Sequence, residues 1–522
     1  MTAIESVVEA GFIAVRNPAD GSVVGKVSID GPEVVAEKAR RLRAAQADWE
    51  DIGPRERKRW LLSFQDWVLD NAGQITDVLL SETGKCRADA SLEATATADA
   101  IKYWACNAEA FLGDRHPKAH SLLWQTKKFT TRYRPHPLVG VITPWNFPFI
   151  MPALDAVPAL AAGAAVLVKP SEVTPLSAVE LVRGWEEVGA PPVLGLVTGY
   201  GETGASVVAN ADFLQFTGST ATGRRVAVAC AERLIPFSLE LGGKDPAIVL
   251  ADADVERAAN GIVWGGFFNS GQVCVSVERV YVEAPIYDEF VAMLTAKVGD
   301  LRQGQEANGY HYDVGAMATS AQRDIVARHV DDAVSAGAWV TTGGTATGVG
   351  TFFAPTVLAG VDQSMACMRE ETFGPTLPVV RVADEDEAIR LANDSAYGLS
   401  ATVWTGDDDR GERVARQLEV GAVNVNDALA NVFCPQLPMG GWKQSGVGYR
   451  AGGAAGVIKY CRQQAITTPR IPTQSREMLW YPVSPGRMKF ALGAMRGLAA
   501  HGLRRRVGLS PRSAPAKSQG PV

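Results

Sequence analysis

The stretch Phe213-Leu-Gln-Phe-Thr-Gly-Ser-Thr-Ala-Thr-Gly223 passes from a short apolar run through a glycine turn into the start of a helix. Further apolar runs lie on both sides of it, separated by helical segments: GVIT from 140, AAVLVKP from 164, VLGLVTG from 193 and PAIVL from 246. Strands that alternate with helices in this way form parallel sheets. We therefore predict an α/β fold with a parallel sheet in this part of the chain.

A second α/β region is predicted in the C-terminal half. Its apolar runs are RVYVE from 279, WVTTGG from 339, TLPVVRV from 376, LSATVWT from 399 and GAVNVN from 421. A chain of 522 residues is too long for one compact core, so we expect two large lobes.

The segments that flank these regions have simpler patterns. A hairpin is expected around Asn17-Pro-Ala-Asp-Gly21, and helical patterns follow Pro32 and Pro54 up to about residue 113. Residues 122–134 alternate polar and apolar side chains and then meet two prolines. This pattern indicates a strand outside the main parallel sheet.

Composition excludes several classes of protein. Hydrophobic residues make up 47% and charged residues 21%, which is typical of a folded protein, and the net charge of -6 gives no reason to expect a nucleic-acid partner. Seven scattered cysteines form no cluster with zinc spacing, so we predict no metal site and a reducing, cytoplasmic location. The N-terminus MTAIESVVEAGF lacks the pattern of a secretory signal. The apolar stretch 147–168 contains three prolines and a glycine, which argues against a transmembrane helix.

Three motifs contain residues that could carry chemistry. Cys274 ends the stretch Asn-Ser-Gly-Gln-Val-Cys, where a thiol could act as a nucleophile or pack as an ordinary buried cysteine. Glu240 stands in Leu-Glu-Leu-Gly-Gly-Lys, where burial would make it a general base unless it pairs with Lys244 or another cation. Asn146, in Thr-Pro-Trp-Asn-Phe-Pro, could donate to an oxyanion or cap a turn. Taken singly, each motif leaves both interpretations open.

Taken together, the three motifs resemble those of the aldehyde dehydrogenase superfamily, which carries them in this order. The separation of Glu240 and Cys274, 274 - 240 = 34 residues, also agrees with the spacing usual in that family. The similarity extends from about residue 10 to 468. It implies that Cys274, Glu240 and Asn146 are the catalytic residues of an enzyme that oxidises an aldehyde to a carboxylic acid with NAD(P). It also implies a Rossmann-type cofactor domain, an α/β catalytic domain and a small β arm for oligomerisation.

The resemblance also implies domain boundaries. We expect the NAD(P)-binding domain at 1–117 and 138–242, the catalytic domain at 243–448, the arm at 118–137 and 449–470, and a basic extension at 471–522. In the family, the arm usually joins a sheet of a homodimer or homotetramer.

Further motifs that match the family assign a cofactor site: KPSE from 169, FTGSTATG from 216, EETFGP from 370 and PMGG from 438. The helix start after Gly218 would direct backbone N–H groups and Ser219 at a pyrophosphate. Lys169 and Glu172 resemble the residues that bind the adenosine ribose, and Glu371 resembles the one that holds the nicotinamide ribose. The expected set is Thr143, Pro144, Trp145, Lys169, Ser171, Glu172, Gly218, Ser219, Gly242, Glu371 and Phe373.

The choice of cofactor depends on Glu172. Its carboxylate would repel the 2′-phosphate of NADP, although Lys169 would offset part of the repulsion, so NAD is expected and NADP is the alternative. Gly199-Tyr-Gly-Glu-Thr-Gly204 also fits the GxGxxG pattern of dinucleotide-binding proteins. In the resembling family the phosphate contact belongs to the FTGST turn, so we predict only a tight turn at 199–204.

The family mechanism predicts a thioester on Cys274, an oxyanion held by the Asn146 side chain and the Cys274 backbone N–H, and water activated by Glu240. Relatives that pass the acyl group to coenzyme A typically lack this glutamate, so hydrolysis is predicted. A non-catalytic binding or structural protein on the same fold is the alternative from another class. Some family members place a second glutamate after the position of Gly446, but this chain has no acid in residues 449–455.

An apolar substrate entrance is also expected. It comprises Phe147, Met151, Leu154, Val273 and Val275, with the Val432-Phe433 region. These side chains would suit an aliphatic or aromatic aldehyde. The sequence CVSVER from 274 looks like that of some bacterial semialdehyde-oxidising relatives, so succinic semialdehyde is the alternative substrate.

The C-terminal tail is basic. No Asp or Glu follows Glu477, whereas eight Lys and Arg do; subtracting these eight from -6 leaves -14 for the rest of the chain. Met488, Leu492, Met495, Ala499 and Leu503 recur at helical spacing, so residues 487–506 are predicted to form a basic amphipathic helix. Residues 479–485 resemble the C-terminal extension of class 3 and fatty aldehyde dehydrogenases. Peripheral membrane contact, packing on the enzyme's own surface and disorder are the three alternatives for this segment.

Overall fold

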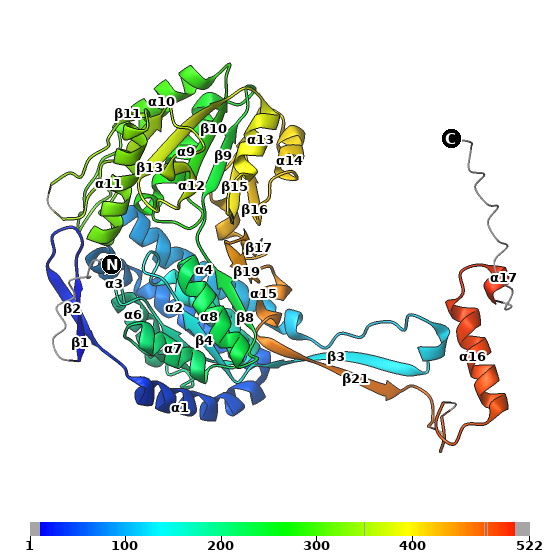
Figure 1. Cartoon of the computed structure of the whole chain (residues 1–522). Helices are drawn as coiled ribbons and strands as arrows, with labels where there is room; N and C mark the ends of the chain where they lie inside the picture. Colours follow the sequence, from blue (N-terminus) through cyan, green and yellow to red (C-terminus); the bar gives the residue numbers. More distant parts are fainter. Residues whose placement is uncertain (1–10, 349, 474, 478, 507–522) are drawn as a thin grey trace, which may run out of the picture. The chain divides into compact units, whose positions relative to one another are not determined.

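The computed structural model describes residues 11–348, 350–473, 475–477 and 479–506, and the chain forms two compact units (Figure 1). The larger unit comprises the residues up to Leu112 together with Pro135–Arg462, and the smaller comprises Gly113–Arg134 together with the residues from Gln463 onward. Residues 1–10, which make up most of the N-terminal stretch MTAIESVVEAGF, lie outside the described residues. The basic residues Arg512 and Lys517 also lie outside them.

The N-terminal part of the larger unit matches the prediction of a hairpin followed by helices. Strands β1 (Phe12–Arg16) and β2 (Val23–Ser28) pair antiparallel. Four helices follow: α1 (Pro32–Asp51), α2 (Gly53–Asp70), α3 (Ala72–Thr83) and α4 (Arg87–Leu112). Prolines in the first turns of α1 and α2 start these helices because the fixed φ of proline suits that position.

The first large sheet has the strand order β19-β8-β7-β4-β5-β6. Its strands are β4 (Leu138–Ile142), β5 (Ala165–Lys169), β6 (Leu194–Leu196), β7 (Phe213–Thr217), β8 (Phe237–Glu240) and the antiparallel edge strand β19 (Gly446–Val447). They are linked by α5 (Ile150–Ala162), α6 (Leu176–Glu187), α7 (Gly201–Asn210) and α8 (Thr220–Glu232). The chain runs outward from β4 through β5 to β6 and then returns to β7, so the order reverses between β4 and β7. Ligands of open α/β sheets bind at such a reversal, outside the carboxyl ends of the strands.

The second large sheet has the order β11-β12-β13-β10-β9-β15-β16 and forms the upper lobe in Figure 1. Its strands are β9 (Asp245–Val249), β10 (Val277–Glu283), β11 (Trp339–Thr342), β12 (Thr356–Ala359), β13 (Thr376–Val382), β15 (Ser400–Trp404) and β16 (Ala422–Val425). Its helices are α9 (Val255–Phe267), α10 (Tyr287–Gly299), α11 (Ser320–Ser335), α12 (Ala366–Arg369), α13 (Glu385–Asn393) and α14 (Asp408–Ala415). All pairings are parallel except that of β11 with β12.

The grouping of PAIVL with the first sheet was wrong. This run forms β9, which pairs with β10 and β15 in the second sheet. Only residues 241–244 separate β8 from β9, and a parallel crossover within one sheet needs a dozen or more residues. The chain therefore passes from the first sheet to the second at this point.

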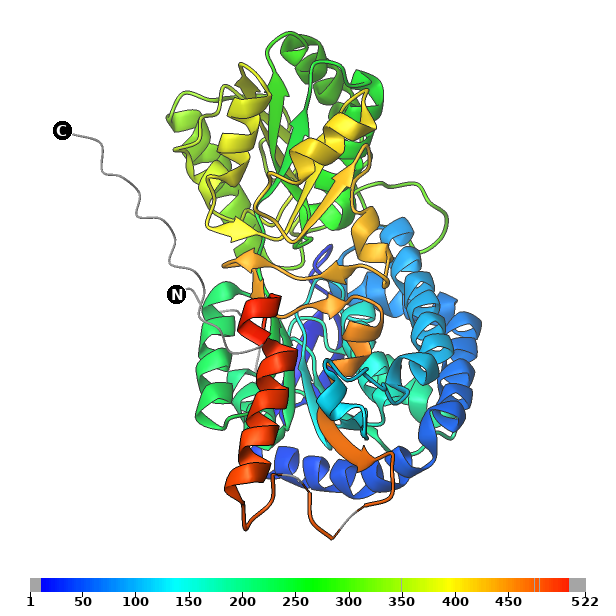
Figure 2. The same cartoon turned by 90° about the vertical axis from the view of Figure 1, so that its right-hand side faces the viewer.

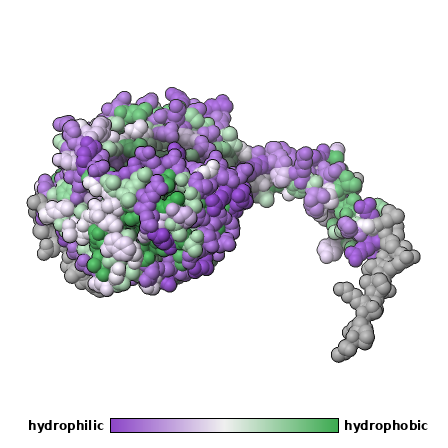
Figure 3. All heavy atoms as spheres, turned by 90° about the horizontal axis from the view of Figure 1, so that it is seen from above, coloured by the Kyte–Doolittle hydropathy of each residue, from purple (hydrophilic) through white to green (hydrophobic). Residues whose placement is uncertain are grey.

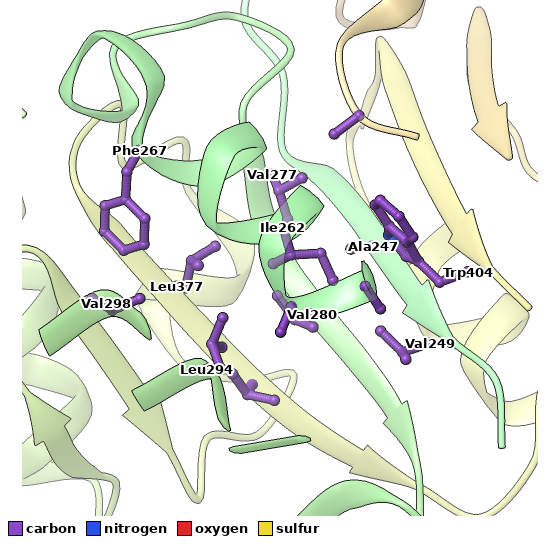
Figure 4. Packing of buried hydrophobic residues seen from close by; sticks show 14 of the residues in the cluster. Ala247, Val249, Ile262, Phe267, Val277, Val280, Leu294, Val298, Leu377 and Trp404 are labelled. Carbon is purple, nitrogen blue, oxygen red and sulfur yellow. The ribbon is translucent and has the colours of Figure 1, made fainter. Parts of the chain in front are cut away.

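The second sheet carries a tightly packed core. Figure 4 shows side chains that interdigitate between β9, β10, β13 and the helices α9 and α10: Ala247, Val249, Ile262, Val277, Val280, Leu294 and Leu377. All seven are buried. This core holds the amino ends of β9, β10 and β13 in place. The segments that directly precede these three strands hold most of the predicted catalytic residues.

After β16 the chain returns toward the first sheet through short elements (Figure 2). These are β17 (Pro438–Met439), β18 (Trp442–Lys443), β19, β20 (Arg450–Ala451) and α15 (Ala454–Ile458), and β18 pairs with β14 (Tyr397–Gly398). Residues 449–462 belong to the larger unit. They therefore contribute to the surroundings of Glu240, as described below.

The smaller unit contains a strand pair and two helices. Strands β3 (Lys127–Pro135) and β21 (Cys461–Pro469) form a two-stranded sheet, and a short 3-10 turn precedes β3 at Leu122–Trp124. The predicted helix at 487–506 is instead two helices, α16 (Pro485–Ala499) and α17 (Leu503–Arg506). The first helix ends where Ala500 adopts an extended backbone conformation with a ψ of 127°, and Gly502, with a φ of +94°, precedes the second helix. Among the described residues, no helix is long and apolar enough to cross a membrane.

Candidate active site

The loop before Cys274 has an unusual backbone. Asn269 and Ser270 have φ values of 52° and 57°, which residues other than glycine seldom adopt. Surrounding groups hold this conformation: the Asp89 carboxylate accepts from the Asn269 N–H at 2.9 Å, and the Ser270 hydroxyl donates to Gly315 O at 3.0 Å. Backbone strain of this kind persists only where neighbouring contacts enforce it, and it is common at active sites.

Gly271 continues this loop with a φ of 70°. A Cβ atom added to it would lie 2.2 Å from Gly374 O, so no larger residue fits between the two backbones. The loop that leads to Cys274 therefore packs directly on the loop that carries Glu371 and Phe373.

Cys274 lies where two cavities meet. One is lined almost entirely by apolar side chains. The other, which we call the polar cavity because Ser219, Gln322 and Glu371 reach it, also has apolar side chains and glycines in its wall. Burial raises the pKa of the Cys274 thiol to about 12. At neutral pH the thiol is therefore protonated until a base or a positive charge favours the thiolate.

Asn146 is attached to the same loop. It follows β4 and is buried, and its Nδ2 donates to Gln272 O at 2.9 Å. The side chain of Asn269 in turn donates to Asn146 O at 3.0 Å. These bonds fix the Asn146 amide relative to the loop of Cys274 and leave its Nδ2 one further hydrogen to donate.

Glu240 ends β8 and is buried. Within the described part of the chain, neither carboxylate oxygen has a hydrogen-bond partner of good geometry. Burial raises the pKa of Glu240 to about 8, and the nearby charges of Arg450 and Lys459 only partly oppose this. A buried carboxyl with such a pKa has the properties of a general base.

The alternative of an ion pair between Glu240 and Lys244 does not hold. The Lys244 ammonium lies 2.6 Å from Glu278 Oε2 and also donates to the Thr372 hydroxyl at 3.0 Å. Glu278 was not recognised from the sequence, although a charged residue inside the apolar strand β10 is an unusual feature.

Glu278 also organises the loop that carries Glu371 and Phe373. Its carboxylate accepts from the N–H groups of Thr372 and Phe373, both at 2.8 Å. Glu371 accepts from the Gly243 N–H at 3.0 Å, and burial raises the pKa of Glu371 to about 8. One buried carboxylate thus positions another beside the second cavity.

A buried polar cluster lies on the other side of Glu240. Arg450 forms a bidentate pair with Asp155 at 2.8 and 2.7 Å and donates to the Thr217 hydroxyl at 2.6 Å. Lys459 donates to Gln215 Oε1 at 2.8 Å, and burial lowers the pKa of Lys459 to about 8. Some family members have a second glutamate in the region after the position of Gly446. In this chain the corresponding surroundings of Glu240 contain cationic side chains instead.

The apolar cavity contains every residue predicted for the substrate entrance. Phe147, Met151, Leu154, Val273, Val275, Val432 and Phe433 all line it. Sequence reasoning missed several other residues on its wall, which come from α4, from α5 and from the region between β16 and β20: Leu92, Ala96, Ile150, Leu429 and Met439. Apart from Met439, which belongs to the PMGG motif, no motif marks them, because they meet only in the fold.

Two charged residues border the apolar cavity, and both are already paired. Glu93 forms a buried ion pair with Lys85 and accepts from the Phe149 N–H at 2.9 Å. Arg450 is held by Asp155 as described above. Neither charge is therefore available to a charged substrate without breaking a buried pair.

The polar cavity contains seven of the predicted cofactor residues. Pro144, Trp145, Gly218, Ser219, Gly242, Glu371 and Phe373 line it together with Cys274. It lies beyond the carboxyl ends of β4 and β7, at the reversal of strand order. Gln322 and Ile325 of α11 complete the wall, and sequence reasoning missed both.

The start of α8 gives this cavity its anion-binding character. Ser219 is the N-cap residue, and its hydroxyl accepts from the Thr222 N–H. The free N–H groups and the dipole at a helix N-terminus favour a phosphate group. At Gly242, a Cβ atom would lie 2.4 Å from Glu371 Oε2, so the absence of a side chain keeps the cavity open. These residues fit a dinucleotide.

The remaining predicted cofactor residues lie at the ends of β4 and β5. The Thr143 N–H donates to Lys169 O at 3.1 Å, and the Thr143 hydroxyl is buried without a partner among the described residues. The Lys169 ammonium donates to Pro170 O at 2.8 Å and lies 3.7 Å from Glu172 Oε2. Ser171 accepts from the Val173 N–H at 3.2 Å.

The turn at Gly199–Gly204 has a structural explanation. Thr203, within the turn, donates to Asp30 O at 2.8 Å, and a Cβ atom on Gly199 would lie 2.1 Å from the Thr203 hydroxyl. The turn does not line the polar cavity. A tight turn packed on the N-terminal segment accounts for the GxGxxG pattern.

Known proteins share this sequence and this fold. The aldehyde dehydrogenase family matches residues 6–466. A relative from Mycolicibacterium smegmatis, whose name describes a succinate-semialdehyde dehydrogenase [NADP(+)], is 40% identical over 456 residues, 86% of this chain and 87% of that protein. The 4,4'-diapolycopene aldehyde oxidase of a Methylomonas species is 39% identical over 477 residues, 90% of this chain and 88% of that protein. The structure of an NAD-dependent aldehyde dehydrogenase from Sinorhizobium meliloti matches with a TM-score of 0.85 and 31% identity, covering 92% of this chain and 95% of that one.

These matches cover almost all of the chain, and they confirm the fold and the family predicted from the three motifs. The chain therefore belongs to the aldehyde dehydrogenase family and is an NAD(P)-dependent oxidoreductase that acts on aldehydes.

Proposed function

We propose that the protein oxidises an apolar aldehyde to its carboxylic acid through a thioester on Cys274, which water hydrolyses. The observation that carries this proposal is the position of Cys274 at the junction of the two cavities. The buried Glu240 is close enough for its charge to act on the thiol. A nucleophile, a base and a second cavity lined by predicted cofactor residues are the parts that this reaction requires.

Acylation begins at the sulfur. The Cys274 thiolate attacks the aldehyde carbonyl carbon, and the resulting alkoxide is stabilised by the Asn146 side chain and the Cys274 backbone N–H. The nicotinamide, when bound, supplies the acceptor for the hydride that leaves this carbon. The product is a thioester between Cys274 and the acyl group.

Deacylation depends on Glu240. Its carboxylate takes a proton from water as the water oxygen attacks the thioester carbonyl, and the Cys274 thiolate leaves as the acid forms. Transfer of the acyl group to coenzyme A is the alternative, and the presence of Glu240 favours hydrolysis. Adding coenzyme A to the reaction and searching for acyl-CoA by mass spectrometry distinguishes the two.

We assign NAD as the preferred cofactor. Glu172 lies beside Lys169 and partly neutralises the cation that would otherwise attract a 2′-phosphate. The M. smegmatis relative carries NADP(+) in its name, so NADP is the competing candidate. Glu172→Gln is expected to lower the KM for NADP about tenfold or more, which corresponds to ~1.4 kcal/mol, and to leave kcat with NAD nearly unchanged. Unchanged selectivity in this variant would contradict the assignment.

We infer that the substrate is an uncharged aliphatic or aromatic aldehyde. The cavity wall is apolar, and its two bordering charges are already paired with Lys85 and Asp155. Succinic semialdehyde is the second candidate because the name of the M. smegmatis relative describes that activity. A carboxylate inside this cavity would lose its hydration without gaining a free cation.

Several further predictions remain part of the proposal. These are the domain boundaries given above, homodimers or homotetramers formed through residues 118–137 and 449–470, a cytoplasmic location, and contact of residues 487–506 with a membrane. A non-catalytic role for this fold is the alternative, and absence of turnover with every aldehyde would support it.

The test is a spectrophotometric panel with both cofactors. Decanal, benzaldehyde and succinic semialdehyde are compared by kcat/KM at the absorbance of the reduced nicotinamide. We expect the apolar aldehydes to exceed the semialdehyde at least tenfold and Cys274→Ala to be inactive while still binding cofactor. A preference for the semialdehyde would contradict the substrate proposal, and absence of turnover with every aldehyde would contradict the enzymatic one.

A further inference from the structure

The smaller unit exposes many large apolar side chains. They occur in the loop before α16, at Leu479, Trp480, Tyr481 and Val483, and on α16, at Phe490, Leu492, Met495 and Leu498. We call these eight residues the apolar tail surface. Tyr481 is 88% exposed and Phe490 is 69% exposed. Figure 3 shows hydrophobic side chains on the surface of this unit, interspersed with hydrophilic ones. Apolar groups gathered at a surface in this way mark sites of interaction.

These side chains are not needed to hold α16 in its own unit. The Ser484 hydroxyl caps the helix by accepting from the Arg487 N–H, and the Arg487 side chain donates to Glu477 O at 2.8 Å. Glu477 pairs with Lys127 of β3 at 2.9 Å. The small side chain of Ala491 is the buried position of the helix. The apolar tail surface is therefore left for another partner.

The charges around this surface all have one sign. No acid follows Glu477, and Arg487, Lys489, Arg496, Arg505 and Arg506 accompany the apolar residues. The rest of the chain is acidic, so the positive charge is a property of this segment. A tail-to-tail contact between two copies would place these cations against each other, which disfavours that pairing of two tail surfaces.

We propose that residues 479–506 form a docking surface for an anionic phospholipid membrane. The aliphatic and aromatic side chains enter the boundary between head groups and acyl chains, where Trp and Tyr are favoured because their rings are amphipathic. The Lys and Arg side chains pair with lipid phosphates and carboxylates. This surface is independent of the chemistry at Cys274, so it stands whether or not the proposed substrate is correct. Because the bound enzyme would sit on the membrane, apolar aldehydes dissolved in the lipid would be within its reach.

The experiment uses the full chain and sedimentation with phosphatidylcholine vesicles that contain either none or 40% phosphatidylglycerol. We expect binding only to the anionic vesicles and a loss of binding as salt increases. Leu492→Ser/Met495→Ser removes two apolar contacts from one side of α16, and Lys489→Glu/Arg505→Glu reverses two charges. Each double variant is expected to weaken binding at least tenfold, because the first removes apolar side chains that enter the lipid and the second turns electrostatic attraction into repulsion.

Matched double variants in the larger unit serve as controls. Leu234→Ser/Val334→Ser and Arg59→Glu/Arg413→Glu alter side chains that are also exposed, and both are expected to bind vesicles like the unaltered chain. All variants should retain aldehyde oxidation in solution, which shows that they fold. Equal binding by tail and control variants, or no binding to anionic vesicles, would overturn the proposal. The proposal would also be overturned if the tail substitutions changed only the oligomeric state, measured by light scattering. The same holds if they changed only the binding of single-stranded nucleic acid.

Discussion

The carboxyl group of Glu240 determines how the proposed reaction responds to pH. Because burial raises its pKa to about 8, Glu240 is mainly protonated at pH 7 and becomes a competent base as the pH rises through 8. We expect the rate of thioester hydrolysis to increase about tenfold per pH unit below 8 and to level off above it. Single-turnover measurements of deacylation isolate this step from formation of the thiolate. A rate that is independent of pH between 6 and 9 would contradict the role of Glu240.

Lys459 is expected to tune this pKa without contacting the substrate. Its positive charge lowers the pKa of Glu240, so Lys459→Met should shift the pH dependence of deacylation to higher pH. Lys459→Arg keeps its charge at pH values where Lys459, whose pKa is lowered to about 8, loses it, so this variant should leave the pH dependence unchanged or shift it to lower pH, opposite to Lys459→Met. If both substitutions shift the profile equally, Lys459 acts through packing and not through its charge.

At the scale of the loops and strands, the pair of Lys244 and Glu278 holds the cofactor cavity together. Glu278→Gln leaves a buried ammonium without its partner, which is expected to cost about 3–5 kcal/mol of the free energy of unfolding. The same substitution loosens the loop of Thr372 and Phe373, so the KM for the cofactor should rise more than the KM for the aldehyde. Urea unfolding and steady-state kinetics measure the two effects.

The double variant Lys244→Met/Glu278→Gln provides the control. Removing the ammonium as well eliminates the unpaired buried charge, so part of the lost stability should return. The cofactor KM should remain high, because glutamine offers one acceptor oxygen where the carboxylate offers two to the N–H groups of the loop. A double variant less stable than Glu278→Gln would show that the pair does not have this role.

The strands and the meeting of the predicted catalytic motifs could be predicted from the sequence, because both follow from the pattern of a buried parallel sheet. Apolar runs such as AAVLVKP belong to strands buried on both faces, and the turns after β4 and β7 must meet at one edge of a parallel sheet. The rhythm of strands and helices alone could not assign PAIVL to its sheet, because only the short connection from β8 decides that; the boundary expected from the family resemblance, at residue 243, does separate it from the first sheet. It also could not identify Glu278 or Arg450, whose roles depend on partners about a hundred or more residues away in the chain.

At the scale of the whole molecule, each of the two large sheets contributes part of the proposed active site. The carboxyl ends of β4, β7 and β8 carry Asn146, Ser219 and Glu240, whereas the segments before β10 and β13 carry Cys274 and Glu371. In the proposed reaction, the cofactor and the aldehyde therefore meet where the two lobes of the larger unit face each other. Substitutions that change the packing of the lobes should affect both KM values together.

The central claim is that a thioester on Cys274 is hydrolysed through Glu240, and trapping that thioester tests it most directly. Glu240→Gln mixed with NAD and decanal should produce about one equivalent of reduced cofactor per chain and then stop. Mass spectrometry should find the acyl group on the peptide that contains Cys274, with a mass increase equal to that of the aldehyde less two hydrogens. Continued turnover at the rate of the unaltered enzyme, or an acyl group on one of the other six cysteines, would contradict the account.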